Sequence, residues 1–155
     1  ETRLRKLEEA NYDAIILAEA GLRRLGLESH ITDILDREWM LPAVGQGALG
    51  LECRSTDAAT LALLDPLNDA ETRAAVLAER EFLRSLGGGC LVPFGALGEV
   101  VGETLTLRGA VLPIDGTRRI AGAVSGVLAE AEPLGRQLAQ QLLDQGAREL
   151  LPRVQ

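Results

Sequence analysis

Cys90 has the most distinctive chemical setting in this sequence. It follows Gly87-Gly88-Gly89 and precedes Leu91-Val92-Pro93, so it belongs to a glycine-rich loop. A thiol on such a loop can be exposed to reagents, which a buried structural cysteine is not. The loop follows the C-terminus of a predicted helix, where the helix dipole disfavours a negatively charged thiolate. Cys90 therefore need not act as a general thiolate catalyst. Two interpretations stay open, a functional cysteine and an ordinary loop cysteine.

The basic residues are almost all arginines, since Lys6 is the single lysine among 16 basic residues. Codon bias is one explanation. A functional explanation is that some guanidinium groups bind carboxylates, which arginine does with two parallel hydrogen bonds and lysine does not. Arg73, Arg80 and Arg84 fall on one face of a predicted helix. That face is either an ordinary solvated surface or a cationic surface that leads toward Cys90 and receives carboxylates.

Other catalytic and binding chemistries find little support. His30 is the single histidine, so a catalytic triad or a Cys–His pair cannot be assembled, and no metal site is predicted. Cys53 lies in an apolar run and is expected in the core. Residues 45–50 match G-x-G-x-x-G, but Pro42 lies just before them and a strand-like run follows. Nucleotide binding would require a helix beginning at Gly47, and a close backbone approach is the preferred explanation.

The composition excludes several classes of protein. A net charge of −7 and 3% aromatic residues argue against nucleic-acid binding. No apolar run reaches the roughly 18 residues of a membrane helix, so no membrane partner is expected. Two cysteines cannot form a disulfide framework, which indicates a reducing, cytoplasmic setting. The charged start without Met favours a processed chain or a fragment over one that opens with a signal peptide.

Residues 1–65 are expected to form part of an α/β region, with a domain boundary near residues 65–69. Short helices are predicted at 2–10, 20–26 and 58–64. Buried strands are predicted at 12–18, where the core 14–18 is continuously apolar, and at 48–53. Strands of this kind require helices or strands on both faces.

Residues 69–155 are expected to form a compact α+β domain. Asn68 and Glu71 resemble a capping box that starts a helix running to about Leu86. Three antiparallel strands are predicted at 95–101, 104–112 and 118–124, with a turn at Asp115-Gly116. A final helix is predicted from about Pro133 to Gln145, where leucines recur every four residues.

Several segments, in order and along nearly the whole chain, resemble the porphobilinogen deaminase (hydroxymethylbilane synthase) family. Residues 41–54, LPAVGQGALGLECR, resemble its LPAVGQGAxGIECR segment, and residues 79–93 resemble its ERxFLRxLxGGCxVP segment. Residues 2–7 and 12–26 resemble its TRLxKL and YDAIILAxAGLxRLG segments. The resemblance departs from the family pattern at Gly87, where glutamate is usual, and at Leu91, where glutamine is frequent.

The resemblance implies a transferase that joins four porphobilinogen molecules and releases ammonia at each step. The chain would grow on a dipyrromethane cofactor held by a thioether to Cys90. Deamination of porphobilinogen gives an electrophilic azafulvene-type species, which a soft sulfur can trap. Each pyrrole has an acetate and a propionate, so arginines would be needed to bind the growing chain.

The resemblance also implies roles for further residues. Arg3 and Arg24 would bind carboxylates of the cofactor and the substrate, and Arg80 would bind substrate carboxylates. Gly21 and Gln46 would line the cofactor cleft.

The resemblance is limited to the C-terminal half of the family protein: the end of domain 2, the strand that returns to domain 1, and domain 3. The missing N-terminal half would supply the catalytic aspartate, so no catalytic residue is assigned in this chain and the isolated chain is expected to be inactive. A non-enzymatic module that binds a small ligand is the alternative.

Overall fold

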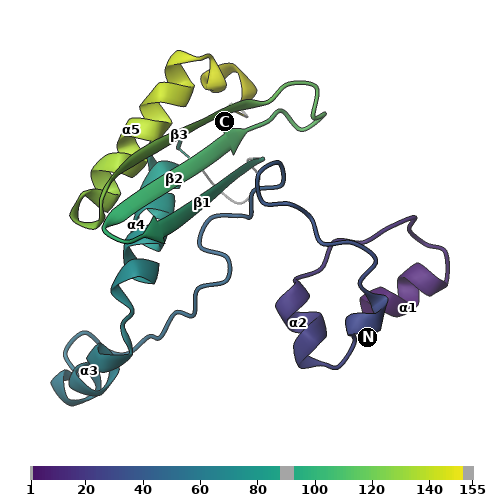
Figure 1. Cartoon of the computed structure of the whole chain (residues 1–155), viewed down its shortest axis with the longest axis horizontal. Helices are drawn as coiled ribbons and strands as arrows, with labels where there is room; N and C mark the ends of the chain where they lie inside the picture. Colours follow the sequence, from purple (N-terminus) through teal and green to yellow (C-terminus); the bar gives the residue numbers. More distant parts are fainter. Residues whose placement is uncertain (1, 88–92, 152–155) are drawn as a thin grey trace. The chain divides into compact units, whose positions relative to one another are not determined.

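The computed structural model describes residues 2–87 and 93–151, and these residues form two compact units (Figure 1). One unit ends at Asp36 and the other begins at Arg37. The first unit contains α1 (Thr2–Glu8), α2 (Glu19–Arg24) and the short 3-10 helix η1 (Glu28–His30). The predicted domain boundary at 65–69 stays a prediction.

The second unit is built around a three-stranded antiparallel sheet and two long helices. Its strands are β1 (Phe94–Val101), β2 (Thr104–Val111) and β3 (Ile120–Val127), in the order β1-β2-β3. Its helices are α3 (Ala58–Leu64), α4 (Ala70–Ser85) and α5 (Ala131–Asp144), with 3-10 turns η2 (Asp65–Leu67), η3 (Leu128–Glu130) and η4 (Ala147–Leu150). The expected α+β domain with three antiparallel strands is confirmed.

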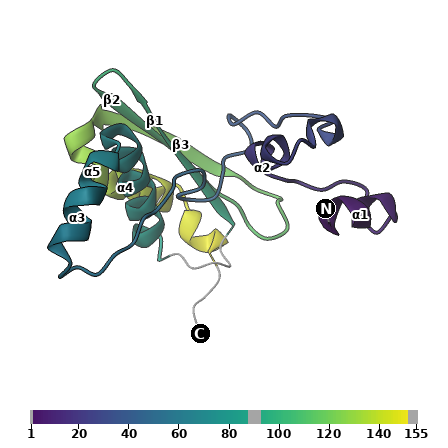
Figure 2. The ribbon, with the colours of Figure 1, turned by 90° about the horizontal axis from the view of Figure 1, so that it is seen from below.

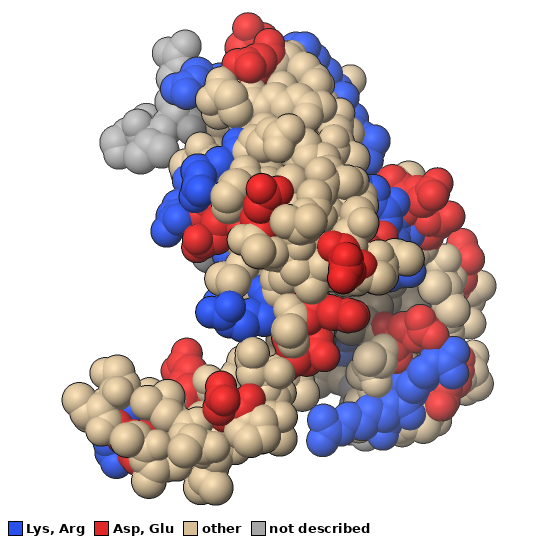
Figure 3. Space-filling view, turned by 60° about the vertical axis from the view of Figure 1, so that its left-hand side comes forward, with Lys and Arg blue, Asp and Glu red and all other residues tan. Residues whose placement is uncertain are grey.

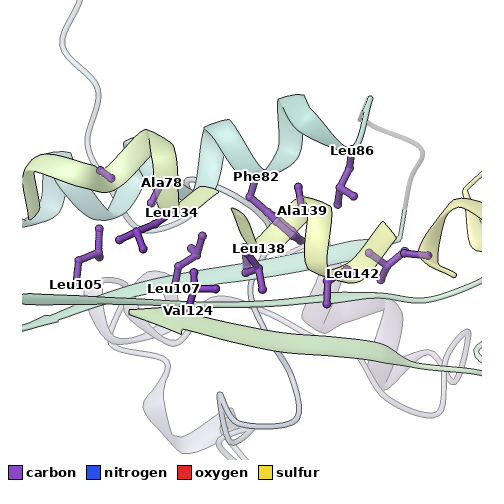
Figure 4. Close-up of a cluster of buried hydrophobic side chains, with 14 of the residues drawn as sticks. Ala78, Phe82, Leu86, Leu105, Leu107, Val124, Leu134, Leu138, Ala139 and Leu142 are labelled. Atoms are coloured by element: carbon purple, nitrogen blue, oxygen red, sulfur yellow. The ribbon is translucent and has the colours of Figure 1, made fainter. Parts of the chain in front are cut away.

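Helices α4 and α5 cover the same face of the sheet (Figures 1 and 2). The core lies between the two layers, where Phe82 of α4 and Leu138 of α5 meet Leu105 and Leu107 of β2 (Figure 4). All four side chains are fully buried. The alternation predicted in β2 therefore separates one face packed on helices from one more exposed face.

Local signals placed these elements to within a few residues, with two differences. Asp69, and not Asn68, caps α4, because its carboxylate accepts the Thr72 N–H at 2.7 Å. β3 runs from Ile120 to Val127, later than the predicted 118–124. α5 ends as expected, because Gly146 takes a left-handed conformation (φ 94°) directly after the C-cap residue.

The two buried strands predicted in the first 65 residues are wrong for this structure. Neither residues 12–18 nor residues 48–53 form a strand. Ile16 is 68% exposed and Leu49 is 97% exposed. Cys53, expected in the core, is only half-buried. Among the described residues, no strand pairs with either apolar run. The side chains of these runs therefore stay largely exposed.

One stability prediction arises from the contact between α4 and α5. A Cβ on Gly135 would lie 2.4 Å from the Ala78 carbonyl oxygen and 2.8 Å from the Glu81 Cβ. We expect Gly135→Ala to push the helices apart and lower the free energy of unfolding by about 1–3 kcal/mol. Gly50→Ala, where nothing lies within 4 Å, is the control. Urea denaturation followed by circular dichroism measures both, and equal midpoints would contradict the expectation.

Candidate functional site

The structure separates the six predicted site residues into three groups. The first unit contains Arg3, Gly21 and Arg24, and the second contains Gln46 and Arg80. Cys90 lies outside the described residues. The structure therefore places Gln46 and Arg80 in the same unit, and each unit presents its own part of the candidate site.

Arg3 lies on α1 with an exposed side chain. On the same helix, the Arg5 Nη1 lies 2.8 Å from the Glu9 Oε1, so the charge of Arg5 is paired. Arg3 forms no ion pair with any residue that the structure describes. Its guanidinium group therefore has its donors free for an external carboxylate.

Arg24 repeats this arrangement on α2. The Arg23 Nε lies 2.7 Å from the Glu19 Oε1, one helical turn earlier, while Arg24 has no acidic partner in the described part of the chain. Gly21 is exposed on the same helix, and nothing lies within 4 Å of the position of a Cβ there. Arg24 and Gly21 thus adjoin open space.

In the second unit, Gln46 lies in a turn that glycine makes possible. Gly45 and Gly47 on either side have φ values of 73° and 83°, which favour glycine. The Gln46 N–H donates to the Ala43 carbonyl oxygen at 3.1 Å, and the Gln46 side chain is exposed. No helix begins at Gly47, since residues 48–57 are described and contain none. The nucleotide-binding alternative lacks the helix it requires.

Arg80 is exposed on α4, and its Nε lies 4.0 Å from the position of a Cβ on Gly45. Arg80 has no acidic partner among the residues that the structure describes. Its helix neighbour Arg84 instead pairs with Glu81, which also binds Arg136 at 3.3 Å. Burial alone would raise the pKa of Glu81, but the hydrogen bonds and charges of Arg136 and Arg84 outweigh it and lower that pKa.

Glu79 is the site residue that reasoning from the sequence missed. Its side chain is 5% exposed and accepts the Gly45 N–H at 2.7 Å and the Gly98 N–H at 2.8 Å. Burial raises the pKa of Glu79, and the two backbone hydrogen bonds oppose that rise. The sequence feature that could have pointed to Glu79 is its position directly before Arg80 in the ERxFLR segment.

A hollow of about 340 Å³ lies between the 46–48 turn, the first half of α4 and β1. Asp69, Glu71 and Glu79 are among the residues that line it, so it suits carboxylate ligands poorly. On the face shown in Figure 3, basic and acidic side chains are interspersed and no large area has one sign. On this face, individual arginines and not a broad basic surface are the candidates for binding anions.

Among residues 2–87 and 93–151, no helix has the length and apolar character needed to cross a membrane. The same residues contain no cluster of three or more histidine, cysteine, aspartate or glutamate side chains suited to a metal ion.

Comparison with known proteins gives two family matches. The model described as "Porphobilinogen deaminase, dipyromethane cofactor binding domain" matches residues 1–62, and the model of the "Porphobilinogen deaminase, C-terminal domain" matches residues 73–144. Curated proteins named porphobilinogen deaminase are similar over 97% of this chain. Those of Trichlorobacter lovleyi and Roseiflexus castenholzii are 51% identical, and that of Syntrophotalea carbinolica is 52% identical.

The alignments cover 48% of the Trichlorobacter and Syntrophotalea proteins and 50% of the Roseiflexus protein. The chain therefore spans about half the length of the curated relatives it matches. The two family models follow one another in chain order and leave few residues between them. The chain belongs to the porphobilinogen deaminase family.

Proposed function

We propose that this chain forms part of an enzyme of tetrapyrrole and heme biosynthesis that joins four porphobilinogen molecules into hydroxymethylbilane with release of ammonia. Cys90 would hold the dipyrromethane cofactor through a thioether. That cofactor, when bound, supplies the pyrrole carbon to which the first substrate is joined. A cytoplasmic location stays a prediction from the cysteine content.

The main structural support for this function is that the arginines at the three carboxylate-binding positions have no acidic partner among the described residues, while a second arginine on each of the same helices has one. On each of α1, α2 and α4, one arginine is neutralised by a nearby glutamate: Arg5, Arg23 and Arg84. The arginine that matches a carboxylate-binding position on the same helix has no acidic partner among the described residues: Arg3, Arg24 and Arg80. On α4, Arg73 also has no acidic partner among these residues, so the contrast is sharpest on α1 and α2. Free guanidinium groups at these positions fit a cofactor and product chain with two carboxylates on every pyrrole.

In this proposal the residues of the chain bind and orient, and they do not transfer protons to the pyrroles. Arg3 and Arg24 hold carboxylates of the cofactor and the growing chain, and Arg80 holds carboxylates beside the Gln46 turn. Gly21 leaves room for pyrroles next to Arg24. The proton transfer belongs to the aspartate of the N-terminal half, which is the partner that the proposal requires.

The exposed apolar runs support the need for that partner. Ile16, Leu49 and Leu51 are all more than half exposed, although continuous apolar runs of this kind are typical of buried strands. We infer that these runs pair with strands in the remaining half of the family's length.

The test compares Arg24 with its paired neighbour in a full-length protein that contains these residues. We expect Arg24→Leu to lower the rate of hydroxymethylbilane formation roughly 10- to 150-fold, the loss of one charge-assisted interaction. Arg23→Leu, which removes a charge already paired with Glu19, is the control and is expected to have little effect. Arg24→Lys should restore the rate only in part, because lysine lacks the planar fork. A normal rate in Arg24→Leu would contradict the role.

A further inference from the structure

The free edge of β1 is covered by two acceptors from outside the sheet. β1 is the edge strand of the order β1-β2-β3, so its outward N–H groups need other partners. The Ala96 N–H donates to the Pro42 carbonyl oxygen at 3.1 Å, and the Gly98 N–H donates to the Glu79 Oε1 at 2.8 Å. One of the two acceptors is thus a nearly buried carboxylate of α4.

The second oxygen of the same carboxylate holds the turn before Gln46. The Glu79 Oε2 accepts the Gly45 N–H at 2.7 Å. A single side chain therefore joins three segments: α4, the edge of β1 and the glycine turn. Because Glu79 is nearly buried, loss of either N–H partner would leave a desolvated acceptor without compensation.

The chain before the turn also lies against the sheet. A Cβ on Gly95 would come within 2.8 Å of the Leu41 Cβ and 2.9 Å of the Pro42 oxygen, so only glycine permits this approach. Arg37 pairs with Glu99 of β1 at 3.2 Å. Residues 37–42 are therefore held against β1. Glu79 holds the segment again at Gly45, through the hydrogen bond from the Gly45 N–H.

From these contacts we propose that Glu79 is a positioning residue, which holds the Gly45–Gln46 backbone at a set distance from Arg80. Arg80 is the next residue on α4, and its Nε lies 4.0 Å from the Cβ position of Gly45. Glu79 would thus act on the reaction through the placement of Gln46 relative to Arg80. This inference rests on the proposed function of those two residues.

The first test uses Glu79→Gln in the 155-residue chain. The amide side chain has one acceptor oxygen, and its NH₂ group faces one of the two N–H donors. We expect hydrogen exchange at the Gly45 and Gly98 amides to accelerate about 10-fold or more relative to Leu107 in the central strand. Glu81→Gln, a buried glutamate of the same helix that binds arginines, is the matched control and should leave this ratio unchanged. Equal acceleration at Leu107 would overturn the proposal.

The second test measures turnover in a full-length protein that contains these residues. We expect Glu79→Gln to lower the rate severalfold in an otherwise unchanged enzyme, and to lower it less in an Arg80→Leu background. Non-additivity is expected because Glu79 acts through the placement of the turn beside Arg80, whereas a purely structural role gives additive effects. Additive effects, or unchanged turnover in Glu79→Gln, would overturn the proposal. If the unmutated protein itself has no deaminase activity, the proposed function fails, and the exchange measurement still decides whether Glu79 holds the turn.

Discussion

A Cys90→Ser variant of a full-length protein that contains these residues is expected to lose the covalent dipyrromethane completely. A thioether requires the cysteine sulfur, and a serine hydroxyl is a far weaker nucleophile toward the carbon electrophile that porphobilinogen deamination provides. A Cys53→Ser variant is expected to retain the cofactor. Cys53 is half-buried, and it lies in the segment LECR, 37 positions before Cys90 in the sequence.

Intact mass under denaturing conditions distinguishes the two variants, because a thioether adduct survives unfolding. The unmutated protein and the Cys53 variant should both show the added mass of a dipyrrole, and the Cys90 variant should show the mass of the polypeptide alone. Retention of the adduct without Cys90 would assign attachment to another residue. Loss of the adduct in both variants would point to a folding defect instead of a missing attachment atom, and a thermal melt of each variant checks this.

The C-terminal fold was predictable because its signals are local. α5 repeats leucines at positions 134, 138 and 142, and all three are buried in the structure. β2 alternates apolar and polar residues over Thr104–Arg108, and its apolar positions face the helices. The capping residue of α4 was less predictable, because Asn68 and Asp69 are both good caps and only the backbone geometry selects Asp69.

The apolar runs at 12–18 and 48–53 have the pattern of buried strands, but the structure has no strand at either position. A run such as Ala14-Ile15-Ile16-Leu17-Ala18 indicates burial on two faces, but the sequence pattern does not say which segment provides the burial. Within the described residues no such segment pairs with either run. An apolar run therefore forms a strand only where another segment of the protein is present to pair with it.

The candidate site was predictable to different degrees. Arg3, Arg24 and Arg80 were selected by resemblance, and the structure adds that they are unpaired among the described residues while Arg5 and Arg23 are paired. The role of Glu79 could not be found by spacing. Its two backbone partners lie 34 residues earlier and 19 residues later in the chain, so only the folded arrangement brings them together.

A polypeptide made of these 155 residues alone is expected to show no turnover of porphobilinogen. The aspartate that handles protons at the pyrrole nitrogens belongs to the N-terminal half in the proposed function. General acid–base catalysis typically contributes about 10²–10⁴-fold, and lost carboxylate-binding groups of that half would add to the deficit. Consumption of porphobilinogen by the purified polypeptide measures this directly, and addition of the N-terminal half as a separate chain is the complementation control.

Hydrogen exchange on the same polypeptide separates lack of catalysis from lack of folding. Amides of β2 around Leu105 and Leu107 should be strongly protected, because both side chains are fully buried beneath α4 and α5. Amides around Ile16 and Leu49 should exchange quickly, because those apolar runs lack strand partners in the described residues. Protection at Leu105 with rapid exchange at Leu49 and no activity would mean a folded C-terminal domain that supplies only part of the cleft. Measurable deaminase activity would show instead that these residues already form a complete catalytic unit, and uniform protection of both regions in a monomer would show that the apolar runs need no further strand partners.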